Sequence, residues 1–284
     1  MHRHHTGFMS LVSFVTLALA GGPCVQTAVP QERDDESAPR VRLTVLYDNY
    51  AYRPSVHTDW GYSCLVELPE TTLLFDTGAR PDILRANSRL LGVDLASVDT
   101  LVLSHAHQDH VGGLNALLSR TNALDVWTLE SFPDGLLQQL RDANAAVHTA
   151  TSPTEIAPSV YLTGELGARL GEQALVIDSA EGLVVVTGCA HPGPVCIARR
   201  ALSVLEGPIH LMVGGFHLLN ASETELQEVI EELASLGVQR VAPSHCSGER
   251  ARSLFKRAYG ERFLESGVGR VLTMPCVAGP TVHP

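Results

Sequence analysis

The fold of this chain is decided by one stretch, which reads Ser104-His105-Ala106-His107-Gln108-Asp109-His110-Val111-Gly112-Gly113-Leu114. Three imidazoles and a carboxylate occur within residues 105–110, and their nitrogen and oxygen atoms are ligands that divalent first-row metals prefer. An apolar run, residues 100–103, precedes the stretch. No such run precedes His2, His4 and His5 near the start of the chain. The stretch therefore predicts a metal site rather than a solvated histidine-rich loop.

The spacing within this motif predicts two neighbouring ligand sets. Residues 99–104 are apolar and partly β-branched, which favours a short buried strand. His105 would follow the end of that strand, and His107, two residues on, would point to the same side and share one ion. Asp109 and His110 are adjacent, so they cannot both point where His105 points. They suit a second ion beside the first.

Two later histidines follow predicted strands and are expected to complete these sets. His191 comes after the apolar run 182–187, and it is the expected third ligand of the first ion. His245 comes after a strand predicted over 240–243, and it is expected to complete the second ion. A hydrogen-bonded structural role is the alternative for each of them.

His217 follows a strand predicted over 209–213 and a pair of glycines, so we expect it to lie in the cleft. Ligand, substrate contact and proton shuttle all stay open for this residue. His57, His148 and His210 are expected to be structural or solvated.

The sequence of motifs resembles the metallo-β-lactamase-fold superfamily of metal-dependent hydrolases. The His-x-His-x-Asp-His pattern at 105–110 carries most of this resemblance, and Asp76-Thr77-Gly78 is similar to the strand-end Asp-Thr-Gly beneath the metal site of that superfamily. Three further blocks are similar to the dihydropterin-ribofuranosylaminobenzene-phosphate-synthase-like branch: Gly188–Gly193, Gly214–Leu218 and Pro243–Gly248. The resemblance covers about residues 41–275. It implies an α/β (α+β) fold, a four-layer αββα sandwich with the site where the loops of the two sheets meet.

The segment pattern agrees with this fold, although alone it would not exclude a doubly wound α/β sheet. Strands are expected over 41–47, 63–68, 72–75, 125–128, 160–163, 174–178 and 183–187. Helices are expected over 81–91, 111–120 and 134–143, and a capping box at Ser222–Glu225 opens another.

The resemblance also implies roles for Asp76 and Cys189. Asp76 would lie behind the ligands and accept a hydrogen bond from a ligand imidazole, fixing its tautomer. Many relatives carry a separate Gly-Asp whose carboxylate bridges two ions, and in this chain Gly188-Cys189 stands at that place. Cys189 is either a thiolate ligand or a small buried residue. The number of ions, one or two, stays open for the same reason.

A divalent ion lowers the pKa of bound water from about 16 to near 7, and it polarises a carbonyl or phosphoryl oxygen. Asp109 is placed to hold an ion and orient this water, so Asp109 and His217 are the candidate catalytic residues. The principal hypothesis is an exported hydrolase of an ester, lactone, amide or phosphoester bond in a small molecule. The alternatives are a transferase like the branch's namesake and a non-catalytic metal-binding protein. Zinc is the expected metal, with manganese and iron as alternatives, and no organic cofactor site is expected.

The chain has 284 residues, of which 45% are hydrophobic, and this suits one domain, expected over 41–284. Its net charge of -11 would repel phosphate backbones, so nucleic acid is not an expected partner. Six cysteines occur, and the sequence assigns neither a disulfide nor an oligomeric state.

The first 40 residues are expected to lie outside this domain. Residues 1–20 fit a secretory signal peptide, because a basic start precedes an apolar run too short to span a bilayer and small residues end it. Residues 21–40 are mostly polar and predict a flexible leader. The pattern predicts a periplasmic or extracellular protein with no membrane span in the mature chain. A lipid anchor at Cys24 fits poorly because Pro23 precedes it, and an uncleaved N-terminal anchor is a further alternative.

Overall fold

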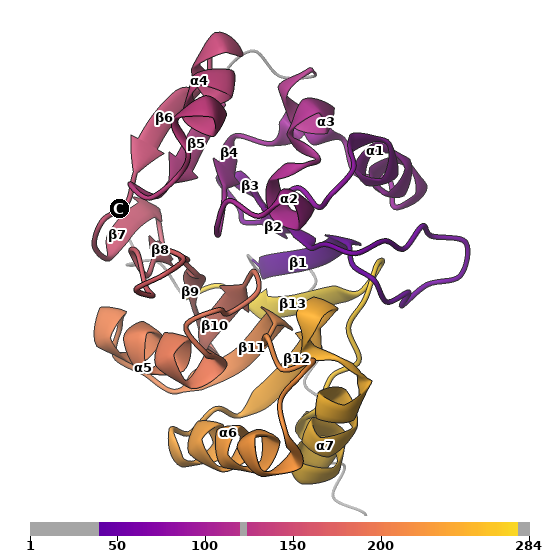
Figure 1. Cartoon of the computed structure of the whole chain (residues 1–284), viewed down its shortest axis with the longest axis vertical. Helices are drawn as coiled ribbons and strands as arrows, with labels where there is room; N and C mark the ends of the chain where they lie inside the picture. The colour runs from indigo at the N-terminus through magenta and orange to yellow at the C-terminus, as the bar shows by residue number, and fades with distance from the viewer. Residues whose placement is uncertain (1–39, 120–123, 278–284) are drawn as a thin grey trace, which may run out of the picture. The chain divides into compact units, whose positions relative to one another are not determined.

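The structure, a computed structural model, describes residues 40–119 and 124–277. Two β-sheets lie face to face, and helices cover the outer face of each (Figure 1). In spatial order, the first sheet contains β13 (Val271–Pro275), β1 (Arg40–Tyr47), β2 (Ser63–Glu67), β3 (Thr72–Phe75), β4 (Thr100–Val102), β5 (Asp125–Thr128) and β6 (Ala146–Thr149). The second contains β12 (Arg240–Ser244), β11 (Ile209–Gly215), β10 (Gly182–Thr187), β9 (Leu175–Ser179), β8 (Val160–Leu162) and β7 (Thr154–Ala157).

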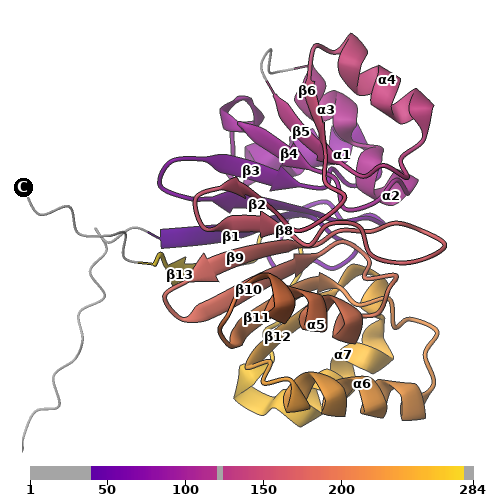
Figure 2. The ribbon, with the colours of Figure 1, turned by 90° about the vertical axis from the view of Figure 1, so that its left-hand side faces the viewer.

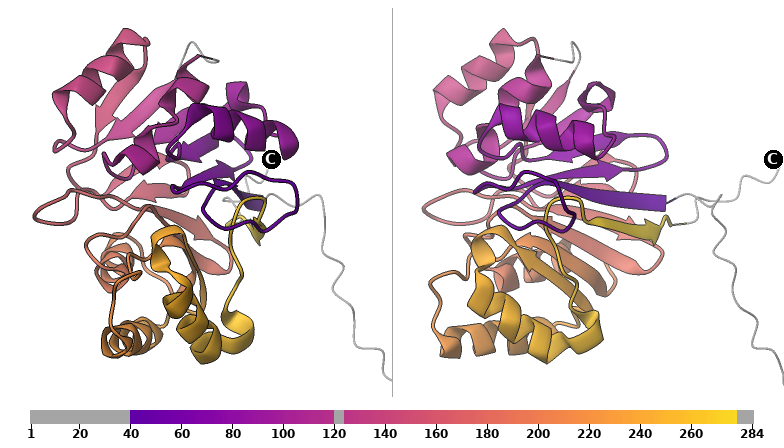
Figure 3. Two further views of the ribbon diagram at one scale, coloured as in Figure 1. Left: turned by 45° about the vertical axis from the view of Figure 1, so that its right-hand side comes forward. Right: turned by 90° about the vertical axis from the view of Figure 1, so that its right-hand side faces the viewer.

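The helices divide between the two outer faces. Those on the first sheet are α1 (Pro81–Leu90), α2 (Gln108–Val111), α3 (Leu114–Leu118) and α4 (Asp134–Asp142). Those on the second are α5 (Pro194–Val204), α6 (Glu223–Ser235) and α7 (Glu249–Tyr259). Figure 3 shows both helical layers with the sheets between them. The predicted αββα sandwich is therefore confirmed.

Successive strand residues point to opposite faces, and this alternation builds the layers. On β10, Leu183 and Val185 pack against the helices, whereas Val184 and Val186 face the other sheet. The core between the sheets also contains Phe75 of β3. Because both faces of each sheet are covered, the loops at the strand ends are left to build a site.

Parallel pairing brings several strand ends to one edge. Strands β3, β4 and β5 run parallel in the first sheet, and β10, β11 and β12 run parallel in the second. Figure 2 shows α2, which follows β4, at the opposite edge from the start of β1 and the end of β13. The loops after β4, β10, β11 and β12 carry all the histidines expected in the site.

The helix predicted over 111–120 is different in the structure. A short helix, α2, begins at Gln108, and Gly112 and Gly113 separate it from α3. A Cβ at Gly113 would lie 1.9 Å from the carbonyl oxygen of Thr77, and one at Gly112 would lie 2.1 Å from that of Ala79. The two glycines therefore let the metal-motif turn pack directly on the backbone that follows Asp76.

The periodicity analysis found most other elements but missed β6, β7, β13 and α7. The capping box at Ser222 is present, with its hydroxyl accepting from the backbone N–H of Glu225 and the Glu225 carboxylate accepting in return. No helix in the described ranges is both long and apolar enough to cross a bilayer. The predicted signal peptide, the leader up to residue 39 and Cys24 lie outside the described residues.

Candidate metal centre

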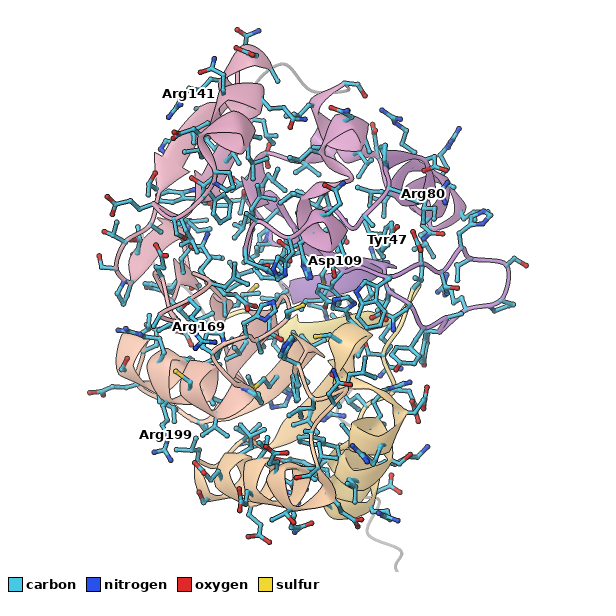
Figure 4. The ribbon with its side chains drawn as sticks, in the orientation of Figure 1. Tyr47, Arg80, Asp109, Arg141, Arg169 and Arg199 are labelled. Carbon is cyan, nitrogen blue, oxygen red and sulfur yellow. The ribbon has the colours of Figure 1, made fainter. Side chains whose placement is uncertain are left out.

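Seven side chains that the sequence nominated as ligands meet in two adjoining sets. The first set is His105, His107 and His191; the second is Asp109, His110, Cys189 and His245. Within each set the ligand atoms lie within 4.8 Å of one another. The rings of His105 and His110 are 4.2 Å apart, so the sets are direct neighbours. Figure 4 shows Asp109 near the centre of the view, with Arg141 and Arg199 toward the outer edge.

The atom spacing in the second set fits one tetrahedral cation. Cys189 Sγ lies 3.2 Å from His110 Nε2 and 3.4 Å from His245 Nε2. Asp109 Oδ2 lies 3.6 Å and 3.3 Å from the same two nitrogens. Donors bound at zinc distances with tetrahedral angles would be about 3.3–3.6 Å apart. The geometry favours the ligand interpretation of Cys189 over that of a small buried residue.

One carboxylate, that of Asp76, orients an imidazole of each set. It acts through hydrogen bonds on the Nδ1 side of His110 and His105. Asp76 Oδ2 lies 2.7 Å from His110 Nδ1, and it also accepts at 2.7 Å from the hydroxyl of Ser104. The same hydroxyl lies 2.9 Å from His105 Nδ1, so it accepts that N–H. Both histidines therefore carry the proton on Nδ1, which leaves the Nε2 lone pair free to face a cation. Asp76 lies where the sequence placed it.

His245 is oriented by residues that sequence reasoning did not select as site residues. Its Nδ1 lies 3.0 Å from Asn49 Oδ1, and the Asn49 amide donates to its carbonyl at 3.1 Å. Asp48 accepts from the backbone N–H of His245, and burial raises the pKa of Asp48 to about 6. Asp48 and Asn49 follow β1 as Asp76 follows β3, and this position after a strand was the signal that could have found them.

Glu172 is the second support that the sequence did not reveal. It is fully buried, and its carboxylate accepts the backbone N–H groups of three consecutive residues: Cys189 at 2.9 Å, Ala190 at 2.7 Å and His191 at 2.7 Å. Burial raises the pKa of Glu172 to about 7, against the lowering effect of these hydrogen bonds. One carboxylate thus fixes the turn that supplies a ligand to each set. Glu172 stands in no motif, so no sequence signal marked it.

His191 gives an independent test of whether a cation fits. Its Nε2 is buried and has no hydrogen-bond partner among the described residues. Burial and the neighbouring His217 and His107 lower the pKa of His191 to about 4, so the ring is neutral. A buried lone pair without a partner is costly in a closed protein, and a bound cation would satisfy it.

The electrostatics of the two sets differ. Burial and the neighbouring imidazoles hold the pKa of His105 far below its ordinary value. Burial alone would raise the pKa of Asp109, but the hydrogen bond to His245 and the charge of His110 bring it below the usual range. Burial lowers the pKa of His110, yet the Asp76 carboxylate outweighs burial and raises it. The second set is therefore the more anionic one.

The remaining predicted histidines lie at the edge of the two ligand sets or outside them. The ring of His217 lies 4.2 Å from that of His191, at the edge of the site. His57 is exposed, and His210 lies on β11 with Nε2 3.3 Å from Glu181. His148 lies on β6, which the sequence analysis missed, and its Nε2 is 2.7 Å from Asp125.

The family model described as "Metallo-beta-lactamase superfamily" matches residues 61–245, which span both ligand sets. This chain belongs to the metallo-beta-lactamase superfamily. The fold of that superfamily implies binding of divalent metal, and the two ligand sets agree with this implication.

Relatives within the superfamily carry different names. The 7,8-dihydropterin-6-methyl-4-(beta-D-ribofuranosyl)-aminobenzene-5'-phosphate synthase of Methanocaldococcus jannaschii is 23% identical over 282 residues, covering 82% of this chain and 96% of the synthase. The solved structure of a metal-dependent hydrolase of the beta-lactamase superfamily is 28% identical, with a TM-score of 0.68, and covers 82% of this chain and 98% of its own. Human tRNase Z, short form, is 11% identical with a TM-score of 0.52, covers 82% of this chain and 99% of its own, and shares the fold.

Proposed function

We propose that this chain is a metal-dependent hydrolase that acts on an ester, lactone, amide or phosphoester bond of a small molecule. The observation that carries this proposal is the pairing of a first set of three imidazoles with an adjoining anionic set. Three protein ligands leave a coordination position for water or substrate, as in catalytic zinc sites. We propose zinc as the metal of both sets.

A bound divalent cation supplies Lewis acidity and a water of lowered pKa. The chain's own residues provide the rest of the chemistry. Asp109 belongs to the second set, and its carboxylate can accept a hydrogen bond from the attacking water and orient it. Asp76 and Glu172 hold the ligands in place, so little reorganisation is needed when substrate binds.

A groove of about 460 Å³ opens beside His191 and His217 and gives substrate a place next to the metal centre. Its lining continues along α6 and includes Glu225, Glu228 and Glu232, with no arginine or lysine among the lining residues. Glu232 forms an ion pair with Arg199 at 2.9 Å, so the negative charge of this wall comes mainly from Glu225 and Glu228. This charge favours a neutral or cationic substrate end over a phosphorylated one.

Trp60 lies beside the second ligand set. Its ring is 45% exposed and lies 4.9 Å from that of His245, whereas the neighbouring Tyr62 is fully buried. The backbone on either side of Trp60 is fixed: Tyr47 donates to Asp59 at 2.7 Å, and a Cβ at Gly61 would lie 2.5 Å from the Asp109 carbonyl oxygen. A rigidly held, half-exposed indole is suited to contact an apolar or planar part of the substrate.

The transferase alternative is favoured by one observation, the similarity that covers 96% of the dihydropterin synthase. The acidic groove argues against it, because the named product of that relative carries a phosphate. A turnover panel separates the two. Hydrolysis of p-nitrophenyl esters or lactones by the zinc-loaded protein is expected, with phosphodiesters turned over more slowly because of the acidic groove. Activity that appears only with a pterin donor would establish the transferase, and zinc binding without any turnover would establish a binding protein.

We also propose that the protein is exported, on the evidence of the N-terminal pattern alone. Expression of the full chain followed by fractionation and mass measurement of the mature N-terminus tests this. Cleavage near residue 20 with recovery outside the cytoplasm is expected, and an intact cytoplasmic chain would overturn it.

A further inference from the structure

Cys246 belongs to neither ligand set, yet its sulfur is enclosed by residues of the site. It directly follows the ligand His245, and its side chain is 4% exposed. Its Sγ lies 3.3 Å from the carbonyl oxygen of Cys189 and 3.3 Å from the backbone nitrogen of His217, which donates to it. A Cβ at position 215 would lie 2.7 Å from this sulfur, so Gly215 keeps the space open for it. The position of Cys246 is therefore tightly defined.

The sulfurs of Cys189 and Cys246 and a ring nitrogen of His217 lie within 4.8 Å of one another. Two thiolates and an imidazole form a donor set that soft cations such as Zn²⁺ prefer. We propose that Cys189, Cys246 and His217 form a third cation site for zinc, in which the Cys189 thiolate bridges to the ion of the second set. The inference goes beyond the hydrolase proposal, and it does not need turnover to be tested.

The third site would be open toward the substrate groove. Cys189 and Cys246 are buried, but His217 is exposed and lines the groove together with Leu218 and Asn220. Three protein donors on the inner side leave the fourth position of a tetrahedral ion facing the groove. Of the three roles that the sequence left open for His217, this arrangement selects the ligand role.

The backbone around these donors is held in an unusual conformation. His217 has φ 52°, His245 has φ 47° and Ala190 has φ 62°, and each is a donor or neighbours one. Non-glycine residues seldom adopt such positive φ values, and those that do gather at functional sites. The loops after β10, β11 and β12 therefore each have a residue with positive φ at or beside the donor that they contribute.

The test is a zinc count on reduced, zinc-saturated protein after removal of free metal. The wild type is expected to hold three ions per chain, and both Cys246→Ser and His217→Ala to hold one fewer. Matched controls are Cys64→Ser, a buried free cysteine on β2, and His148→Ala, a half-buried histidine on β6, and both are expected to keep three.

Cobalt titration gives a second readout, because only thiolate ligation adds a sulfur-to-cobalt absorption band. The last equivalent bound by the wild type is expected to strengthen this band, and Cys246→Ser is expected to lack that increment. Two ions in the wild type, an undiminished count in both variants, or a Cys189–Cys246 disulfide that survives reduction would overturn the proposal. If Cys246→Ser fails to fold, His217→Ala carries the test because its ring is exposed.

Discussion

The two ligand sets differ in charge and in exposure. The first consists of three imidazoles, of which His107 is exposed and His191 is half-buried. The second contains a carboxylate and a thiol, and His110, Cys189 and His245 are all buried. A closed set that includes a carboxylate holds a cation tightly, whereas an open set of three imidazoles keeps a position free for exchange. The buried second set is therefore suited to retain its metal ion, and the more open first set is suited to give substrate access to the centre.

Stepwise removal of metal by a chelator should distinguish the two ligand sets most clearly. We expect activity to fall to background when the first ion leaves, while the second ion is still bound, and zinc, manganese or iron to restore it. Activity and metal content measured together at increasing chelator concentration give the answer. Simultaneous loss of both ions would show that the two sets are equivalent, and activity that persists without metal would exclude metal-dependent hydrolysis.

His107→Ala should lower kcat/KM by on the order of 10³-fold, since it removes a ligand of the ion that we expect to activate water. The ion of the second set should remain. His148→Ala, which removes a half-buried ring that pairs with Asp125 and belongs to neither set, is the matched control. Full metal stoichiometry in the purified His107→Ala protein would show that this residue is not a ligand.

Asp76→Asn and Asn49→Ala test the two sets separately, because these residues support the ligands through hydrogen bonds. Asp76 serves both sets, through Ser104 and through His110, whereas Asn49 contacts His245 alone. Loss of such support weakens metal binding by about 10–100-fold. We expect Asp76→Asn to weaken both ions and Asn49→Ala to weaken only the second, as measured by competition with a chromophoric chelator. Equal effects on both ions from Asn49→Ala would contradict the separation of the sets.

Acid should destabilise the metal-free protein. The folded structure holds the pKa of His105 far below its ordinary value of about 6.5, so the unfolded chain binds a proton that the folded chain does not. The free energy of unfolding therefore falls as the pH drops below about 6.5, by up to roughly 1.4 kcal/mol per pH unit for this group. Urea titrations of metal-free wild type and His105→Gln should differ in this slope. Identical slopes would contradict the burial of an uncharged His105.

Trp60→Ala should have the smallest effect, a rise in KM of about 3–10-fold with kcat little changed, since loss of stacking costs about 0.5–1.5 kcal/mol. Trp127→Phe is the control, because Trp127 lies on β5 and stacks on His148. Quenching by cobalt in the second set should affect Trp60 and spare Trp127. A lower kcat at unchanged KM would place Trp60 in support of His245 instead.

Local patterns in the sequence predicted the layers and nearly all of the ligand sets. Continuous apolar runs marked strands such as β10, and the motif spacing separated His105 and His107 from Asp109 and His110. These features depend on neighbours in the chain, and short-range patterns record them.

Contacts between distant segments were not predictable in this way. Glu172 lies 17 residues before Cys189, and its role follows only from the path of the loop that buries it. The helix expected from Val111 onward begins earlier because the turn packs on residues 77–79, a contact that periodicity cannot show. The loop after β1 likewise lies beside the segment that leads into β13 (Figure 3), and the backbone N–H of Tyr52 donates to the Val268 carbonyl at 3.0 Å.

The close packing of Gly113 on Thr77 limits how this centre could be engineered. With only 1.9 Å between a hypothetical Cβ and the Thr77 carbonyl oxygen, the histidine motif and the Asp-Thr-Gly loop form one interlocking piece. A designer who transplants residues 105–113 into another scaffold would have to carry 76–79 with them, since neither segment has the right shape without the other.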